Sequence, residues 1–242
     1  MLKLHYNLEK ISMGLVGAII AVASVGGIVE IAPLFTIQST VEIPDDMRPN
    51  TPLELAGREI YIREGCYACH SQMVRHLADE IDRYGPYSLA SESAYDHPML
   101  WGSKRTGPDL ARVGGKYSDD WHVAHLTNPR DFVPVSIMPA YPWLMRPLDT
   151  HLIEANLATL ARLGVPYDAQ MVSNALGDAR AQARPDGDGA DGLRDRYGEG
   201  IALRAFDGDP ARLTEMDALV AYLQSLGKLT NAAAALLKED AQ

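Results

Sequence analysis

The residues most suited to chemistry are the two cysteines and the histidine that follows them. Cys66, Cys69 and His70 form a C-x-x-C-H motif, which holds both cysteines of the chain. This spacing is typical of a covalent c-type haem attachment site. The two thiols would add to the two vinyl groups at one edge of the haem, and the next residue would become the proximal iron ligand. The motif therefore predicts one covalent haem, with His70 as an axial ligand.

Two other kinds of site use the same cysteine spacing. A C-x-x-C pair can act as a redox dithiol, or it can supply half of a zinc site. A redox dithiol does not require His70, and the sequence has no second cysteine pair to complete a zinc site. The histidine therefore favours haem, and a redox dithiol is the alternative.

The sixth iron ligand is expected to be a methionine. Met138 is favoured over the other methionines and the free histidines, because Pro139 stiffens the loop that would present its sulfur. A thioether ligand favours reduced iron and raises the reduction potential. Met171 and Met216 are expected to fill the core, as most methionines do. Two protein ligands would leave no open iron position, which predicts an electron carrier rather than a haem enzyme or ligand sensor.

Two amphipathic helices are expected, one before the motif and one near the end of the chain. Thr51 and Pro52 begin the first helix as its N-cap and first helical residue. Thr214 or a neighbour caps the second helix, and Gly227 ends it. Each helix has an apolar face, so both are expected to contribute to one core.

This pattern resembles class I cytochromes c. In that family the first and last helices cross where a glycine of one admits an aromatic side chain of the other, and Gly57 and Tyr222 match these residues. A Gly-Pro-x-Leu loop also accepts the Nδ1–H bond of the proximal histidine on its proline carbonyl, which fixes the tautomer and basicity of that histidine. Pro108 matches this proline. The resemblance implies an all-α, class I cytochrome c-like haem domain with loop insertions.

An almost uninterrupted apolar run covers residues 11–37. As a helix it would span roughly 40 Å, more than the ~30 Å hydrocarbon core of a bilayer, so it predicts one transmembrane helix. Lys3 and Lys10 precede the run and favour a cytoplasmic N-terminus. A cleaved signal peptide is the alternative, with a small-x-small site at residues 21–23, but the apolar run continues well beyond that site.

Glu30 is an acidic residue inside this apolar run. A carboxylate within a membrane segment is costly and usually faces protein or water. Small residues at helical spacing, such as Gly14 and Ala18, would also let another helix approach closely. We therefore predict that the membrane helix is an assembly surface, the alternative being that Glu30 lies near the outer interface.

The composition divides the chain into an anchor, a linker, a folded domain and a tail. The predicted boundaries are 1–40 for the transmembrane anchor, 41–52 for the linker, 53–228 for the cytochrome c domain and 229–242 for the tail, in which 231–237 is a helical candidate. Residues 164–209 are rich in Gly and Asp and are expected to form a solvated insertion. Their aspartates do not have the spacing of an EF-hand loop, which disfavours a calcium site there. The net charge of −10 argues against nucleic acid as a partner.

Longer blocks resemble one family, the monohaem subunit of cbb3-type cytochrome c oxidases. The blocks are residues 26–35, 66–75, 95–98, 101–114 and 138–144. The resemblance covers about residues 10–163 and 213–228, and the 164–209 insertion departs from the usual shorter connection. A rival family is the small subunit of nitric oxide reductase, which also has one membrane helix and one c haem. The block at residues 101–110 favours the oxidase.

The resemblance implies a role, partners and a location. The haem c would relay electrons from a dihaem cytochrome c subunit to a membrane subunit that holds haem b and the oxygen-reducing haem–copper centre. The chain would cross the bacterial inner membrane once, with its haem domain in the periplasm. Ser103 would be a ligand of a calcium ion at the subunit interface. Lys104, Arg105 and Arg112 form a basic cluster suited to haem propionates, the alternative being a solvated basic loop.

Overall fold

The computed structural model describes residues 5–6, 9–36 and 43–231 of the chain. The chain divides into two compact units, one up to Glu42 and one from Ile43 onward, and each is described by itself. The described residues form helices and no β-strand; one isolated bridge joins Pro147 and Thr214. The all-α fold class is therefore confirmed. The helix predicted at 231–237 lies outside the described residues except for Asn231.

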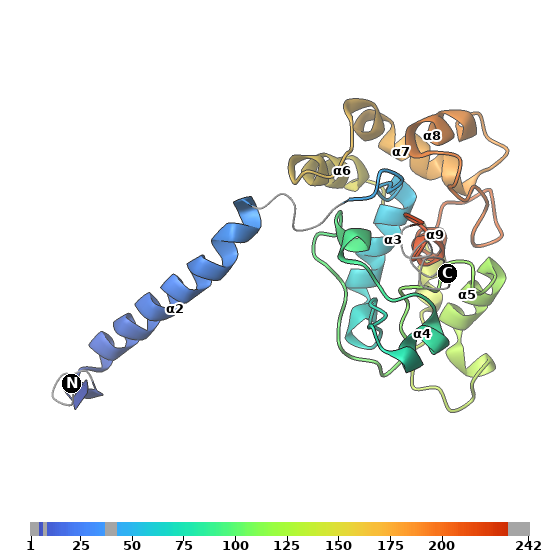
Figure 1. Cartoon of the computed structure of the whole chain (residues 1–242). Helices are drawn as coiled ribbons and strands as arrows, with labels where there is room; N and C mark the ends of the chain where they lie inside the picture. The colour runs from blue at the N-terminus through green and yellow to red at the C-terminus, as the bar shows by residue number, and fades with distance from the viewer. Residues whose placement is uncertain (1–4, 7–8, 37–42, 232–242) are drawn as a thin grey trace, which may run out of the picture. The chain divides into compact units, whose positions relative to one another are not determined.

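The first unit contains one long apolar helix, α2 (Ser12–Thr36). Its segment Ser12–Pro33 has 22 residues and a mean hydropathy of 2.2, which is long and apolar enough to cross a membrane. Pro33 lies within the last turns of the helix. Glu30 is exposed on its surface, as are most of the surrounding apolar side chains. The predicted membrane helix is thus a single continuous α-helix (Figure 1).

The second unit is built around helices α3 (Pro52–Arg63) and α9 (Glu215–Ser225). Thr51 caps α3, and its side chain and that of Glu54 form a reciprocal capping box with the backbone. Thr214 caps α9 in the same way. Both predicted helix starts are confirmed. Every residue of α9 is buried, so this helix forms the centre of the core.

Helices α3 and α9 cross at Gly57. A Cβ atom on Gly57 would lie 1.9 Å from the carbonyl oxygen of Ala218 and 2.8 Å from Cβ of Tyr222, so no other residue fits at this crossing. The Tyr222 ring packs edge-on against Tyr61, with ring centroids 5.6 Å apart. The predicted pairing of Gly57 with Tyr222 is confirmed.

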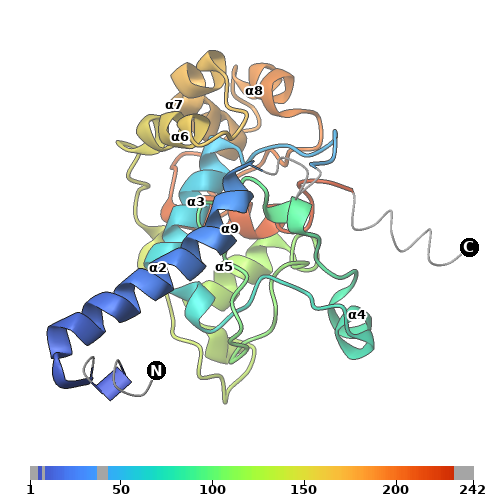
Figure 2. The same ribbon diagram turned by 60° about the vertical axis from the view of Figure 1, so that its left-hand side comes forward.

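Shorter helices surround this crossing. They are α4 (Ala78–Tyr84), α5 (Asp119–Thr127), α6 (Ile153–Arg162), α7 (Ala169–Ala183) and α8 (Ala190–Tyr197), with 3₁₀ turns at Cys66–Ala68, Ala90–Ser93, Pro129–Asp131 and Pro142–Met145. In both views of the domain, α6, α7 and α8 lie together at one end and α4 and α5 at the other, with α3 and α9 between them (Figures 1 and 2). The loops at the α4–α5 end carry the C-x-x-C-H motif and its surroundings.

The 164–209 insertion is not the solvated segment that its composition suggested. It contains α7 and α8, and α7 buries Ala175, Ala179 and Gln182. The Thr51 hydroxyl, which caps α3, donates a hydrogen bond of 2.5 Å to the Gln182 side chain. The many alanines of α7 hid its apolar face, because alanine is small and scores weakly as a hydrophobic residue. The insertion therefore stabilises the start of α3.

Part of the predicted linker also belongs to the folded domain. Met47 and Asn50 are buried, and Arg48 makes two hydrogen bonds to the Glu54 carboxylate, of 2.6 and 2.9 Å. The Arg48 amide also donates to the carbonyl oxygen of Leu229, near the end of the described chain. The segment leading into α3 is therefore held both by α3 itself and by the residues that follow α9.

Candidate haem site

The two cysteines flank a single 3₁₀ turn directly after α3, with Cys66 as its first residue and Cys69 as its C-cap. This turn covers Cys66–Ala68, and Gly65, with a φ of 73°, allows the sharp exit from the helix. Cys66 is half-buried against the core and Cys69 is exposed; both thiols are free. Burial raises the pKa of the Cys66 thiol to about 12. A redox-active cysteine needs a lowered thiol pKa, so this environment disfavours the dithiol alternative.

The His70 imidazole is held by the loop at residues 107–110. Its Nδ1 lies 2.8 Å from the carbonyl oxygen of Pro108. A carbonyl can only accept, so Nδ1 is the donor, and in the neutral imidazole Nε2 is then the metal-binding nitrogen. This is the contact that the Gly-Pro-x-Leu resemblance implied for Pro108. The geometry fits an iron ligand whose tautomer is fixed by a backbone acceptor.

Gly107 provides the space for that imidazole. A Cβ atom on Gly107 would lie 2.2 Å from Cε1 of His70, well inside any allowed contact. The loop is also tied to the motif by backbone hydrogen bonds, because the Gly107 amide donates to the Cys69 carbonyl and the Leu110 amide donates to the Ser71 carbonyl. The loop and the motif therefore form one rigid unit.

The three basic residues predicted to bind propionates have different environments. Lys104 is exposed. Arg105 forms an ion pair with Glu80, with a shortest N–O distance of 2.5 Å. The guanidinium groups of Arg105 and Arg112 are both bound by carboxylates of the domain. Their contacts with propionates stay a prediction, in which each guanidinium would bind a propionate and its carboxylate partner at the same time.

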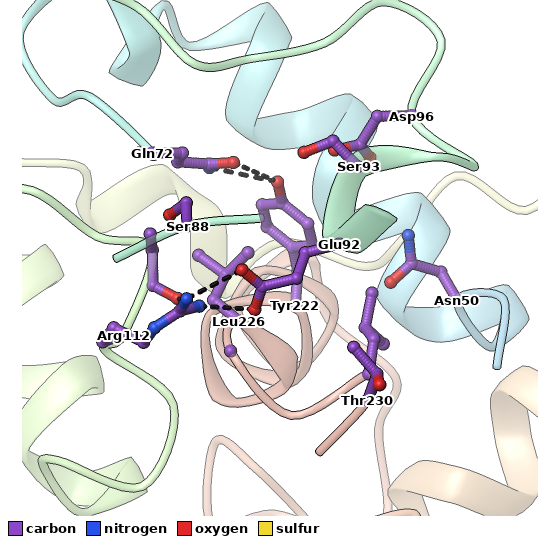
Figure 3. A pocket seen from close by; sticks show the side chains of 13 residues that line it. Asn50, Gln72, Ser88, Glu92, Ser93, Asp96, Arg112, Tyr222, Leu226 and Thr230 are labelled. Carbon is purple, nitrogen blue, oxygen red and sulfur yellow. Dashed lines mark hydrogen bonds and ion pairs between the residues drawn. The ribbon is translucent and has the colours of Figure 1, made fainter. Parts of the chain in front are cut away.

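The ion pair of Arg112 lies at a cavity of about 50 Å³ that both polar and apolar side chains line. Figure 3 shows the Arg112 guanidinium on the Glu92 carboxylate, with both hydrogen bonds 2.7 Å long. The Tyr222 hydroxyl and the Gln72 amide meet on another side of the same cavity. Gln72 follows His70 by two residues, so this pair fastens the motif to α9.

Met138 lies in the loop between α5 and the 3₁₀ turn at Pro142–Met145. Its side chain is half-buried and packs against the core, and its amide donates to the Ser136 hydroxyl at 3.2 Å. The Tyr141 amide donates to the Leu126 carbonyl, which ties this loop to α5. The neighbouring side chains of Val135 and Ile137 are 86% and 75% exposed. Axial ligation by Met138 stays a prediction.

Two histidines of α5, His122 and His125, are further functional candidates, although the sequence favoured Met138 over the free histidines as an iron ligand. Burial lowers the pKa of His125, and the nearby His70 imidazole lowers it further. Nδ1 of His125 and Nε2 of His122 are buried without a hydrogen-bond partner among the described residues. The His125 ring stacks on Trp121, with centroids 4.5 Å apart. An unpaired buried nitrogen close to His70 would suit a polar group of a bound cofactor, such as a propionate.

Other features of the site gave a weaker signal in the sequence. Gly107 is part of the predicted loop, but the need for glycine there follows only from the position of the His70 ring. Asp109 and Glu80 are both buried and both contact the segment after His70. Neither side chain belongs to the C-x-x-C-H motif, so the spacing of that motif could not identify these contacts. Ser103, the predicted calcium ligand, is exposed, and its role stays a prediction.

Comparison with known proteins agrees with this geometry. The family model described as cytochrome C oxidase, mono-heme subunit/FixO matches residues 5–230, which is nearly the whole chain. The chain therefore belongs to this family. A search of curated proteins found no match.

Proposed function

We propose that this member of the monohaem cytochrome c oxidase subunit family binds one covalent c haem and relays electrons within a cbb3-type oxidase. The contact of His70 Nδ1 with the Pro108 carbonyl, 2.8 Å long, carries the proposal. In the neutral imidazole it makes Nε2 the nitrogen that can bind a metal, directly after two free thiols at the start and the end of one 3₁₀ turn. These groups together suit a haem that is bound through both thioether bonds and an axial nitrogen.

The residues around the motif fit that cofactor. Cys66 and Cys69 would hold the porphyrin edge, and His70 and Met138 would be the two axial ligands. Gly107 leaves room for the His70 ring, and the unpaired Nδ1 of His125 offers a hydrogen-bonding nitrogen for a polar group of the haem. When bound, the haem supplies a one-electron iron couple. Two protein ligands would exclude substrate from the iron, which suits electron transfer and not catalysis.

The proposed partners follow from the family and from α2. A helix long and apolar enough to cross a membrane suits a subunit anchored in the bacterial inner membrane, with its haem domain in the periplasm. Electrons would arrive from a dihaem cytochrome c subunit and pass to the haem–copper subunit that reduces oxygen. Ser103 would contribute to a calcium site at the interface with that subunit.

Extraction in mild detergent tests the assembly. We expect the chain to co-purify with a copper-containing complex that consumes oxygen. A complex that contains non-haem iron and reduces nitric oxide would refute the oxidase proposal and support the small subunit of a nitric oxide reductase.

The axial ligand is tested separately. The variant Met138→Ala should lower the reduction potential and open the iron to carbon monoxide, because the thioether favours reduced iron. The matched variant Met145→Ala should leave both properties unchanged. If Met145→Ala alone lowers the potential, Met138 is not the ligand.

A further inference from the structure

Arg105 is one of the most highly bonded side chains in the domain. Its Nε donates to the Ser71 hydroxyl at 2.8 Å, and a terminal nitrogen donates to the Met73 carbonyl at 2.9 Å. Two further hydrogen bonds, of 2.5 and 2.7 Å, go to the two oxygens of Glu80. The guanidinium therefore joins its own loop to the segment that follows His70 and to α4.

Asp109 makes a second connection to the same segment. Its buried carboxylate accepts from the Ser71 hydroxyl at 2.6 Å and from the Met73 amide at 2.9 Å. The other carboxylate oxygen accepts from the Ala111 amide at 2.8 Å. Pro108 lies between Arg105 and Asp109 in the sequence, and both of these side chains bind Ser71, the residue after His70.

Glu80 completes the network from the first turn of α4. The side chain is 4% exposed, and it also accepts from the Arg75 amide at 2.8 Å. The hydrogen bonds from Arg105 outweigh desolvation and lower the pKa of this carboxyl to about 2. The carboxylate is therefore charged at neutral pH, and removal of it would leave the Arg105 guanidinium without its main partner.

We propose that the ion pair of Glu80 with Arg105 positions the Pro108 carbonyl against His70 and so helps to set the potential of the bound haem. The inference rests on the proposed function and goes beyond it. It assigns Glu80 and Arg105 to setting the reduction potential through the position of His70, and not to binding a propionate. A histidine that donates Nδ1–H to a fixed carbonyl is a more basic ligand. A more basic ligand stabilises ferric iron, so loosening the loop should raise the potential.

The test compares Glu80→Gln with Arg105→Gln in the full-length chain, solubilised in mild detergent. We expect each variant to shift the equilibrium toward ferrous iron by about tenfold, which is about 59 mV for one electron. A direct charge effect on the iron predicts opposite signs, because one variant removes a negative charge and the other a positive charge. If both variants raise the reduction potential, the effect must come from the position of the loop at Pro108 and not from the charge that was removed. The double variant should show the same shift as either single variant.

The matched control is Asp178→Asn. Asp178 is equally buried, and Arg196 binds both of its carboxylate oxygens. This ion pair joins α7 to α8, at the other end of the domain from α4 (Figures 1 and 2). The control should lower the melting temperature and leave the potential unchanged. If haem is lost from Glu80→Gln, the milder variant Ser71→Ala tests the same link, because both Arg105 and Asp109 bind that hydroxyl.

Two results would overturn the inference. Unchanged potentials in Glu80→Gln and Arg105→Gln, with lowered melting temperatures, would make the ion pair purely structural. Shifts of opposite sign would make it an electrostatic effect. Neither result would affect the proposed function, which is tested separately by the c-haem spectrum of the parent chain and by the complex with which it co-purifies.

Discussion

At His70, three neighbouring groups decide what the imidazole can bind. The Pro108 carbonyl fixes the proton on Nδ1, Gly107 leaves space for the ring, and Cys69 anchors the preceding backbone. Each acts through a different physical effect, namely hydrogen bonding, steric fit and chain connectivity. Together they fix the position of the ring and the nitrogen that donates to the loop.

The first prediction at this scale is that Gly107→Ala displaces the His70 ring. A methyl group 2.2 Å from Cε1 cannot be accommodated without movement of the ring or the loop. We expect the free energy of unfolding to fall by about 1–3 kcal/mol, the usual cost of overpacking. The reduction potential should rise, because the contact with Pro108 is weakened. The control Gly200→Ala lies in open space and should change neither quantity; an unchanged Gly107→Ala variant would refute the proposed fit.

A second prediction concerns the pH dependence of the Glu80 ion pair. The folded-state pKa is about 2 and the ordinary value is 4.5, so this carboxyl contributes stability above pH 4.5 that is lost as the pH falls toward 2. Glu80→Gln should therefore be less stable than the parent at pH 7, and the difference should shrink below pH 4.5. Denaturant unfolding at pH 7, 5, 4 and 3 measures this. A difference that stays constant over this range would contradict the pairing, and Glu59→Gln, at an exposed residue, is the control for loss of a glutamate.

The sequence predicted the residues that would bind haem better than the residues that hold them in position. Cys66, Cys69, His70 and Pro108 belong to motifs whose spacing reflects the chemistry directly. The partners of Arg105 could not be predicted, because Glu80 lies in a different element and only the fold brings the two together. The same holds for His125, whose place near His70 depends on how α5 packs.

At the scale of elements, the crossing of α3 and α9 determines where the motif begins. Cys66 follows the end of α3 by three residues, so any movement of α3 against α9 would be transmitted to the haem site. Caps and apolar faces were sufficient to predict both helices. They were insufficient for α7 because its buried residues are mainly alanines.

Gly57→Ala should therefore weaken the whole domain. The added methyl group would lie 1.9 Å from the Ala218 carbonyl oxygen, which forces α3 and α9 apart. We expect a loss of about 3 kcal/mol in the free energy of unfolding. Gly177→Ala, in open space on α7, should instead stabilise the protein slightly, by about 0.5–1 kcal/mol. Equal effects of the two substitutions, measured by thermal unfolding, would mean that helix propensity dominates and that the crossing is not tight.

At the scale of the whole molecule, α2 has features that an anchor alone does not need. Glu30 is the one charged residue of a mostly apolar helix. We predict that Glu30→Leu leaves haem attachment intact, because the haem site lies in a separate compact unit. It should weaken retention of the chain in the solubilised complex, because a buried carboxylate in a membrane usually has a specific partner. Parent-like co-purification and oxygen consumption would assign Glu30 to the membrane interface instead.

The most direct test of the account is the mass of the denatured, purified chain. We predict that the parent chain retains one haem through unfolding. The single variants Cys66→Ser and Cys69→Ser should each hold the haem by one remaining thioether bond or lose it. The double variant should lose the haem entirely. His70→Ala should keep covalent haem but lose the low-spin spectrum, because the thioether bonds do not depend on the axial ligand. A parent chain recovered with two free thiols and no bound haem would contradict the central claim.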